Sequence, residues 1–176
     1  MQEKRYPVER IDGDLEAALA ELSRLQPDVI IEGGSNNRAY LKTLVQATLH
    51  NPYIGLDLNP EIRDSKFTHY GNCFRPEHVQ PLITQYNSKR PALLSYYALE
   101  ALLSDRLNHE DRKDSEDRLA LSVIVKFCTQ LYKVQFHIIM GRYISDEMEL
   151  FFERSHKAGW HIRDFGQGDL ILMTRE

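Results

Sequence analysis

Two short apolar runs, each carrying an acid near its end, constrain the fold of this chain more than any other feature of the sequence. Residues 28–33 include Glu32, and residues 53–58 include Asp57. Both runs have the length and aliphatic content of buried strands. The first continues into Gly-Gly-Ser-Asn-Asn and then into a segment with helical periodicity. A glycine-rich turn of this kind lets a ligand approach the backbone at the carboxyl end of a parallel strand.

The rest of the chain alternates between helical and extended patterns. Either Asp12 or Asp14 can cap the first helix, which ends before Pro27. Helices are predicted for residues 14–26, 38–50, 76–86, 119–131 and 146–157, and strands for 28–33, 53–58, 67–70, 92–97, 134–143, 160–165 and 169–174. Such alternation predicts a parallel sheet with helices on both faces. The last two strands flank a Gly-containing turn and predict a hairpin.

Taken in order, these segments resemble the class I S-adenosylmethionine-dependent methyltransferases. In the glycine-rich loop, Glu32, Gly34 and Ser35 match the family pattern, whereas Asn36 and Arg38 stand where further glycines are usual. Other segments also resemble the family: the acid Asp57, residues 71–74, residues 91–100, and the stretch from 136 to 160 that ends in Ala-Gly-Trp. The resemblance implies an α/β three-layer sandwich with a seven-stranded, mostly parallel sheet whose last strand is antiparallel. The length of 176 residues and a 42% hydrophobic content suit a single domain over residues 1–176.

The resemblance also implies a cofactor site for S-adenosylmethionine. Its implied cofactor contacts are Glu32, Gly33, Gly34, Ser35, Asp57, Leu58, Asn72, Cys73, Ser95 and Tyr96, and Tyr97 would line the substrate opening. In the family, the acid at position 57 holds the ribose hydroxyls and the segment around position 72 frames the adenine. Simpler roles stay open. Glu32 and Asp57 can cap strand ends, Asn36 and Asn37 can cap a helix, and the two tyrosines can pack in the core.

The expected function is a methyltransferase with an open site that acts on a macromolecule or together with a protein partner. Methyl transfer is an in-line displacement, so it needs positioning and exclusion of water but no nucleophilic side chain. The stretch from residue 139 to 152 looks like that of seven-stranded protein-lysine methyltransferases, but Ser95, Tyr96 and Tyr97 stand where those enzymes carry an acidic motif. The alternative is a non-catalytic, methyltransferase-like binding or scaffold protein.

Composition narrows the classes of partner and location. The net charge is −4 and the basic residues are scattered, which disfavours nucleic acid as a partner. Cys73 and Cys128 do not form a zinc or disulfide pattern, and the histidines have no metal-ligand spacing, so no metal site is expected. No apolar run is long enough for a membrane span or signal peptide. These features predict a cytoplasmic protein without a membrane anchor.

Overall fold

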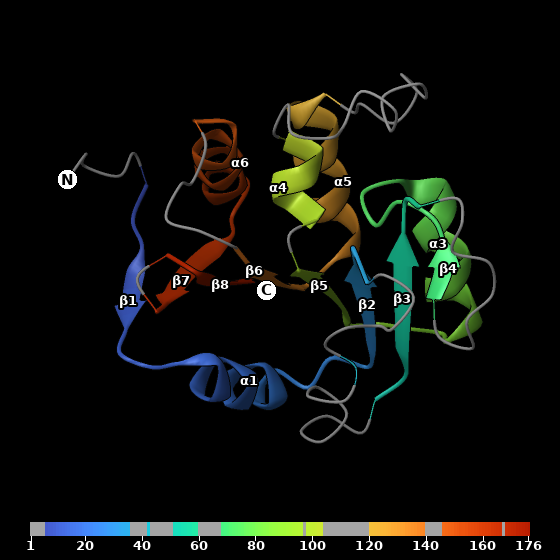
Figure 1. The fold of residues 1–176 in the computed structure, drawn as a ribbon, viewed down its shortest axis with the longest axis horizontal. Coiled ribbons are helices and arrows are strands. Elements are labelled where there is room, and N and C mark those ends of the chain that lie inside the picture. Colours follow the sequence, from blue (N-terminus) through green and yellow to red (C-terminus); the bar gives the residue numbers. More distant parts are fainter. Residues whose placement is uncertain are drawn as a thin grey trace.

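The computed structural model describes residues 6–35, 42, 51–59, 68–96, 98–103, 120–139, 146–166 and 168–176. Within them the chain forms one mixed sheet with helices on both faces (Figure 1). The predicted helix 38–50, apart from Lys42, lies outside the described residues, as do Asn36, Asn37, Arg38 and Tyr97.

Apart from the additional strand β1, the described elements follow the order expected from the sequence. They are β1 (Glu9–Ile11), α1 (Leu15–Arg24), β2 (Val29–Gly33), β3 (Tyr53–Asp57), β4 (Thr68–Tyr70), α3 (Pro76–Gln85), β5 (Pro91–Tyr96), α4 (Ala98–Leu103), α5 (Leu121–Leu131), β6 (Val134–Ile138), α6 (Asp146–Lys157), β7 (His161–Phe165) and β8 (Leu170–Thr174). None of these helices is long and apolar enough to span a membrane.

The sheet has eight strands, in the order β1-β7-β8-β6-β5-β2-β3-β4. Strand β8 runs antiparallel to β6 and β7, and the other described pairings are parallel. The antiparallel last strand was predicted correctly, but the prediction of seven strands was wrong. The additional strand is β1, which pairs with β7 at the edge of the sheet. Its three residues include Glu9 and Arg10, both exposed, so it lacks the apolar run by which strands are found in a sequence.

Local sequence signals explain where the helices begin. The Asp14 side chain accepts hydrogen bonds from the backbone N–H groups of Glu16 and Ala17, at 3.0 and 3.1 Å. It is therefore Asp14, rather than Asp12, that caps α1. Pro76 occupies the first turn of α3, where the missing N–H costs no hydrogen bond.

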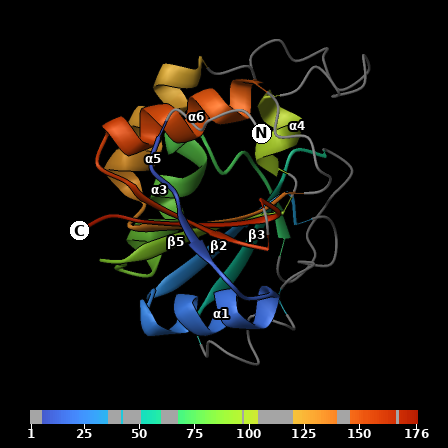
Figure 2. The ribbon, with the colours of Figure 1, turned by 90° about the vertical axis from the view of Figure 1, so that its left-hand side faces the viewer.

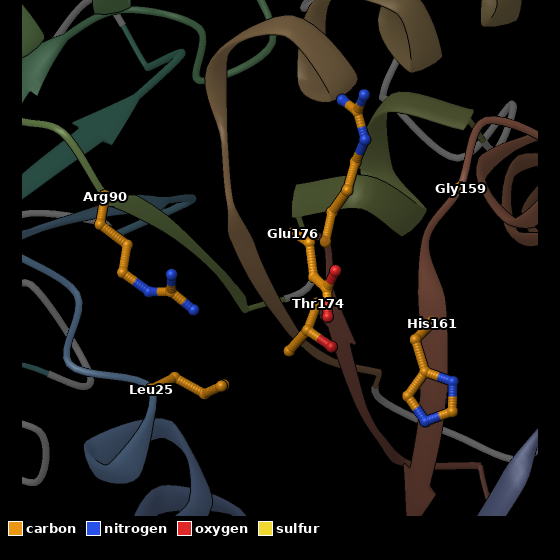
Figure 3. Close-up of a pocket in the computed structure, with 7 residues that line it drawn as sticks. Leu25, Arg90, Gly159, His161, Thr174 and Glu176 are labelled. Carbon is orange, nitrogen blue, oxygen red and sulfur yellow. The ribbon is translucent and has the colours of Figure 1, made fainter.

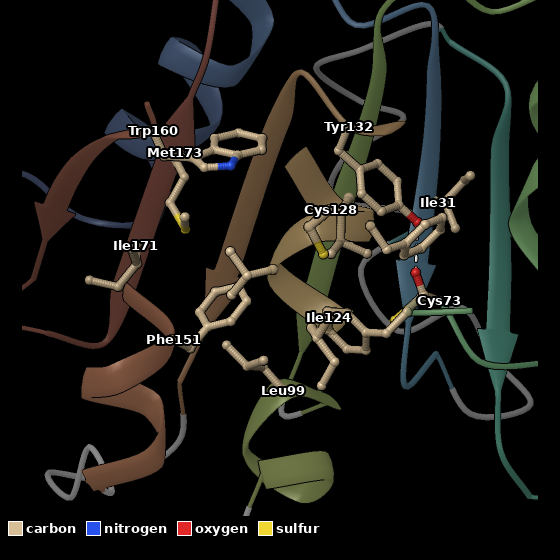
Figure 4. Close-up of a cluster of buried hydrophobic side chains, with 14 of the residues drawn as sticks. Ile31, Cys73, Leu99, Ile124, Cys128, Tyr132, Phe151, Trp160, Ile171 and Met173 are labelled. Atoms are coloured by element: carbon tan, nitrogen blue, oxygen red, sulfur yellow. Dashed lines mark hydrogen bonds between the residues drawn. The ribbon is translucent and has the colours of Figure 1, made fainter. Parts of the chain in front are cut away.

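Helices cover the sheet in two layers, and each layer has its own apolar core. Figure 2 shows α1 on one face of the sheet and α3, α4, α5 and α6 on the other. The α1 face buries Leu22 against Ile30 and Phe136. The opposite face is larger and contains Ile31, Phe151, Trp160 and both cysteines (Figure 4). In that core, the Tyr132 hydroxyl donates to the carbonyl oxygen of Cys73 at 2.9 Å.

Candidate functional site

The strand order places a switch point between β2 and β5. From β2 the chain proceeds to β3 and β4 on one side, and from β5 it proceeds to β6 on the other side. The two central strands are in register, with Gly33 opposite Ser95. In open α/β sheets, the connections that leave the carboxyl ends of two such strands diverge and create a crevice for ligands. The predicted site residues, of which Gly33 is among the first and Tyr96 among the last in the sequence, lie at or near the carboxyl ends of these strands, called the carboxyl edge below.

The glycine-rich loop is held tightly against β3 and β5. Gly34 has a φ of 73°, and its N–H donates to the Leu56 carbonyl at 2.9 Å. A Cβ atom at this position would lie 2.9 Å from the carbonyl oxygen of Tyr96. Ser35 is buried, and its hydroxyl donates to the Thr68 hydroxyl at 3.4 Å. Both the positive φ and the close approach to Tyr96 therefore require glycine at position 34.

Cys73 occupies the space that a side chain at Gly33 would take. A Cβ atom built on Gly33 would meet Cys73 Sγ at 2.2 Å. Burial raises the pKa of the Cys73 thiol, so the thiol is protonated at neutral pH and is not a nucleophile. In this structure Cys73 has a packing role beneath the loop.

Glu32 lies within β2 and is fully buried. The Tyr53 hydroxyl donates a hydrogen bond to Glu32 Oε2, on the sheet face that α1 covers. Burial, together with the nearby Glu32 carboxylate, raises the pKa of Tyr53. Glu32 therefore has an internal partner that links β2 to β3.

Asp57 ends β3 and is half-buried. Its Oδ1 accepts a hydrogen bond from the Asn59 N–H at 2.9 Å, and its main-chain carbonyl accepts one from Gly71 at 2.8 Å. Leu58, the next residue, is also half-buried. The carboxylate thus caps the turn after β3, which is the simpler role left open by the sequence, and it lies at the carboxyl edge.

Asn72 follows β4 and is only 2% exposed. Its Oδ1 accepts from the Phe74 N–H at 2.8 Å, and its own N–H donates to His78 Nδ1 at 2.7 Å. Its Nδ2, in contrast, has no hydrogen-bond partner among the described residues. A buried donor without a partner costs about 1–3 kcal/mol, so this amide group is a natural contact for a ligand acceptor.

The end of β5 contributes less to a binding surface than the sequence suggested. Ser95 is buried, and its hydroxyl accepts a hydrogen bond from the Leu99 N–H at 3.2 Å, at the start of α4. The Tyr96 ring packs against the apolar core on the α1 face. Both residues therefore have structural roles in the described conformation.

The structure brings most of the predicted residues to the carboxyl edge, where the parallel strands end. Some of them offer groups to a ligand, and others are bonded or packed within the protein. Gly34, Asp57 and Asn72 provide polar or backbone groups at that edge, whereas Glu32 and Cys73 have internal partners. Sequence reasoning missed Thr68 and His78, which hold Ser35 and Asn72. No sequence signal pointed to these two, since they become partners only through the fold. Within the described residues, no three histidine, cysteine or carboxylate side chains gather as metal ligands would.

No protein-family model matches the sequence, and no curated protein is significantly similar to it. The functional argument therefore depends on the geometry of this edge of the sheet.

Proposed function

We propose that this protein binds S-adenosylmethionine at the carboxyl edge of β2, β3 and β4 and is a methyltransferase for a macromolecular acceptor. The observation that carries the proposal is that three adjacent parallel strands each end in a turn with a group suited to a nucleoside. These groups are the backbone at Gly34, the carboxylate of Asp57 and the amide of Asn72, whose Nδ2 has no partner within the described part of the chain. Gly34 lies beside the switch point, where ligands of open α/β sheets bind, and Asp57 and Asn72 follow at the ends of the next two strands, β3 and β4.

Each group has a distinct part in the proposed site. The Asp57 carboxylate is half-buried and can accept hydrogen bonds from two ribose hydroxyls, as carboxylate geometry permits. The Asn72 amide donates to an acceptor of the base. Because its Oδ1 and N–H are already bonded to Phe74 and His78, its orientation is fixed before a ligand arrives. The positive φ of Gly34 forms the turn that holds the loop against β3 and β5 at the end of β2.

Methyl transfer at this site would depend on how the protein positions the cofactor and the acceptor. Bound S-adenosylmethionine supplies a sulfonium methyl group, and the side chains at the sheet edge hold and orient the nucleoside and exclude water. The macromolecular acceptor in this proposal comes from the resemblance of residues 139–152 to seven-stranded protein-lysine methyltransferases.

A second candidate is a non-catalytic binding or scaffold protein with this fold. The bonds that Glu32 and Asp57 form within the protein favour it, because both candidate acids already support the structure. The two candidates differ in whether the cofactor binds and whether a methyl group is transferred.

Thermal unfolding with and without S-adenosylmethionine tests the proposal. A ligand at about 100 times its dissociation constant stabilises a protein by about 2.7 kcal/mol. For a chain of this size, that raises the melting temperature by about 5–11 °C. Adenosine and methionine, added separately, serve as controls. Transfer of labelled methyl groups to a cell lysate then distinguishes the two candidates. Stabilisation without transfer favours the scaffold, and the absence of stabilisation would refute cofactor binding.

A further inference from the structure

A depression of about 620 Å³ opens where the parallel strands begin. It lies at the end of the sheet opposite the carboxyl ends of β2, β3 and β4. Leu25 and Arg90, which line it, precede β2 and β5. Across from them, His161 begins β7 and Thr174 ends the antiparallel β8. The volume is typical of small-molecule sites, which span about 300–1,000 Å³.

Arg90 differs from the other half-buried arginines of the described chain. Arg75 pairs with Glu77, Arg163 pairs with Glu21, and Arg175 donates to the carbonyl oxygen of Thr129. The guanidinium of Arg90 has no hydrogen bond or ion pair with any described residue, and its Nε is buried. Partial burial of an unpaired charge is unfavourable, and a bound anion would remove that cost.

The carboxylate of Asp28, which is bonded to the backbone of Arg90, already has several hydrogen-bond donors. Asp28 accepts hydrogen bonds from the Ser88 hydroxyl, from the Lys89 N–H at 2.6 Å and from the Arg90 N–H at 2.9 Å. Burial opposes ionisation of this carboxyl, but the bonds from Ser88, Lys89 and Arg90 outweigh burial and keep the pKa of Asp28 below its usual value. Asp28 thus fixes the backbone of Arg90 and leaves the guanidinium to the depression.

Figure 3 shows the Arg90 side chain extending toward Thr174 and Glu176, with Leu25 nearby. The Thr174 hydroxyl and the Arg175 side chain are further donors of the lining, while Glu176 provides its one acidic side chain. His161 Nε2 lies 2.9 Å from Glu9 Oε2, so this ring nitrogen already has a partner within the protein. We propose that the depression binds a small molecule through a carboxylate or phosphate group, which pairs with Arg90 and accepts from Thr174. A guanidinium binds either group through two parallel hydrogen bonds.

Titrations of the full chain with sodium acetate and with sodium phosphate, followed by amide and arginine Nε–H NMR, test this site. Ionic strength is held constant with sodium chloride. We expect saturable shifts at Arg90, Gly159 and Thr174 with at least one anion. The anion that binds more tightly identifies the ligand group as a carboxylate or a phosphate. Arg90→Gln should weaken binding at least about tenfold, the loss expected for a charge-assisted pair. Lys89→Gln is the matched control, because it removes the same charge from the neighbouring exposed residue and should leave the affinity unchanged.

Glu176→Gln provides an independent test that does not disturb Arg90. Removing the one acidic side chain of the lining should tighten anion binding several-fold, since that like charge no longer opposes the ligand. Shifts that fail to saturate with both anions, or equal affinities in the wild type, Arg90→Gln and Glu176→Gln, would overturn the proposal. The outcome is independent of cofactor binding at the opposite edge.

Discussion

The Cys73 side chain occupies the volume that a side chain at Gly33 would need, although the two residues lie far apart in the sequence. The sequence assigned both to the cofactor site because each belongs to a segment that resembles a methyltransferase. A contact between segments so far apart leaves no trace in either segment alone, so it could not be predicted. The sequence indicated which residues lie at strand ends, but not which residues they contact.

The burial of His137 predicts how the stability of the protein depends on pH. It lies in β6 with its ring centroid 5.8 Å from Phe151 and 6.2 Å from Phe152, and its Nε2 is 3.1 Å from Gln135 Oε1. Burial lowers the pKa of His137 to about 3. Between about pH 6.5 and pH 3 the unfolded chain therefore binds a proton that the folded chain excludes, and stability falls as the pH falls through this window.

Urea unfolding at pH 7 and pH 5 measures this effect. From His137 alone, we expect the wild type to lose about 2 kcal/mol between these values, because each pKa unit corresponds to about 1.4 kcal/mol. His137→Gln should remove that part of the loss. His69→Gln, at an exposed position, should behave like the wild type. If His137→Gln lost as much stability as the wild type, the imidazole would not be the group that titrates.

At the scale of elements, apolar patterning was a reliable guide. Strands β2, β3 and β5 were each predicted to within a residue at either end, and α6 was predicted with its observed bounds. These segments are buried on a whole face or on both faces, so their composition reflects their environment. Strand β1 was missed because its pairing with β7 comes from the backbone of a short, charged segment. Strand β6 ends at Ile138, before the predicted end at 143, and residues 140–143 lie outside the described chain.

The cap of α1 allows an element-scale prediction. The Asp14 carboxylate satisfies two of the first N–H groups of the helix, and α1 buries Ala18, Leu19 and Leu22 against the sheet. Asp14→Ala should lower the free energy of unfolding by about 1 kcal/mol, the usual cost of losing an aspartate cap. Asp12→Ala is the matched control, because Asp12 is exposed and precedes the cap. Equal losses in the two variants, measured by urea unfolding, would show that Asp14 is not the energetically important cap.

At the scale of the whole molecule, the sheet has polar features at both of its edges. Where the parallel strands end lie Asp57 and the amide of Asn72, and where they begin lies the guanidinium of Arg90. The Asn72 Nδ2 and the Arg90 guanidinium have no partner among the residues that the structure describes. Asp57 was named because an acid after an apolar run is visible in the sequence, and Asn72 because residues 71–74 resemble a methyltransferase segment. Arg90 was not singled out, since an arginine before a strand is an ordinary surface residue until the fold shows that it lacks a partner.

Calorimetric titration of S-adenosylmethionine into the wild type and Asp57→Ala tests the central claim most directly. Asp57 lies at a strand end and caps a turn, so its loss should leave the folded structure intact, as the unfolding of the free variant can check. The account predicts one bound ligand per wild-type chain. It also predicts an affinity about tenfold to a hundredfold weaker in Asp57→Ala, because a charge-assisted hydrogen bond contributes about 1.5–3 kcal/mol. Asp12→Ala should bind like the wild type. Equal affinity in the wild type and Asp57→Ala, or no binding to the wild type, would contradict a cofactor site at this edge.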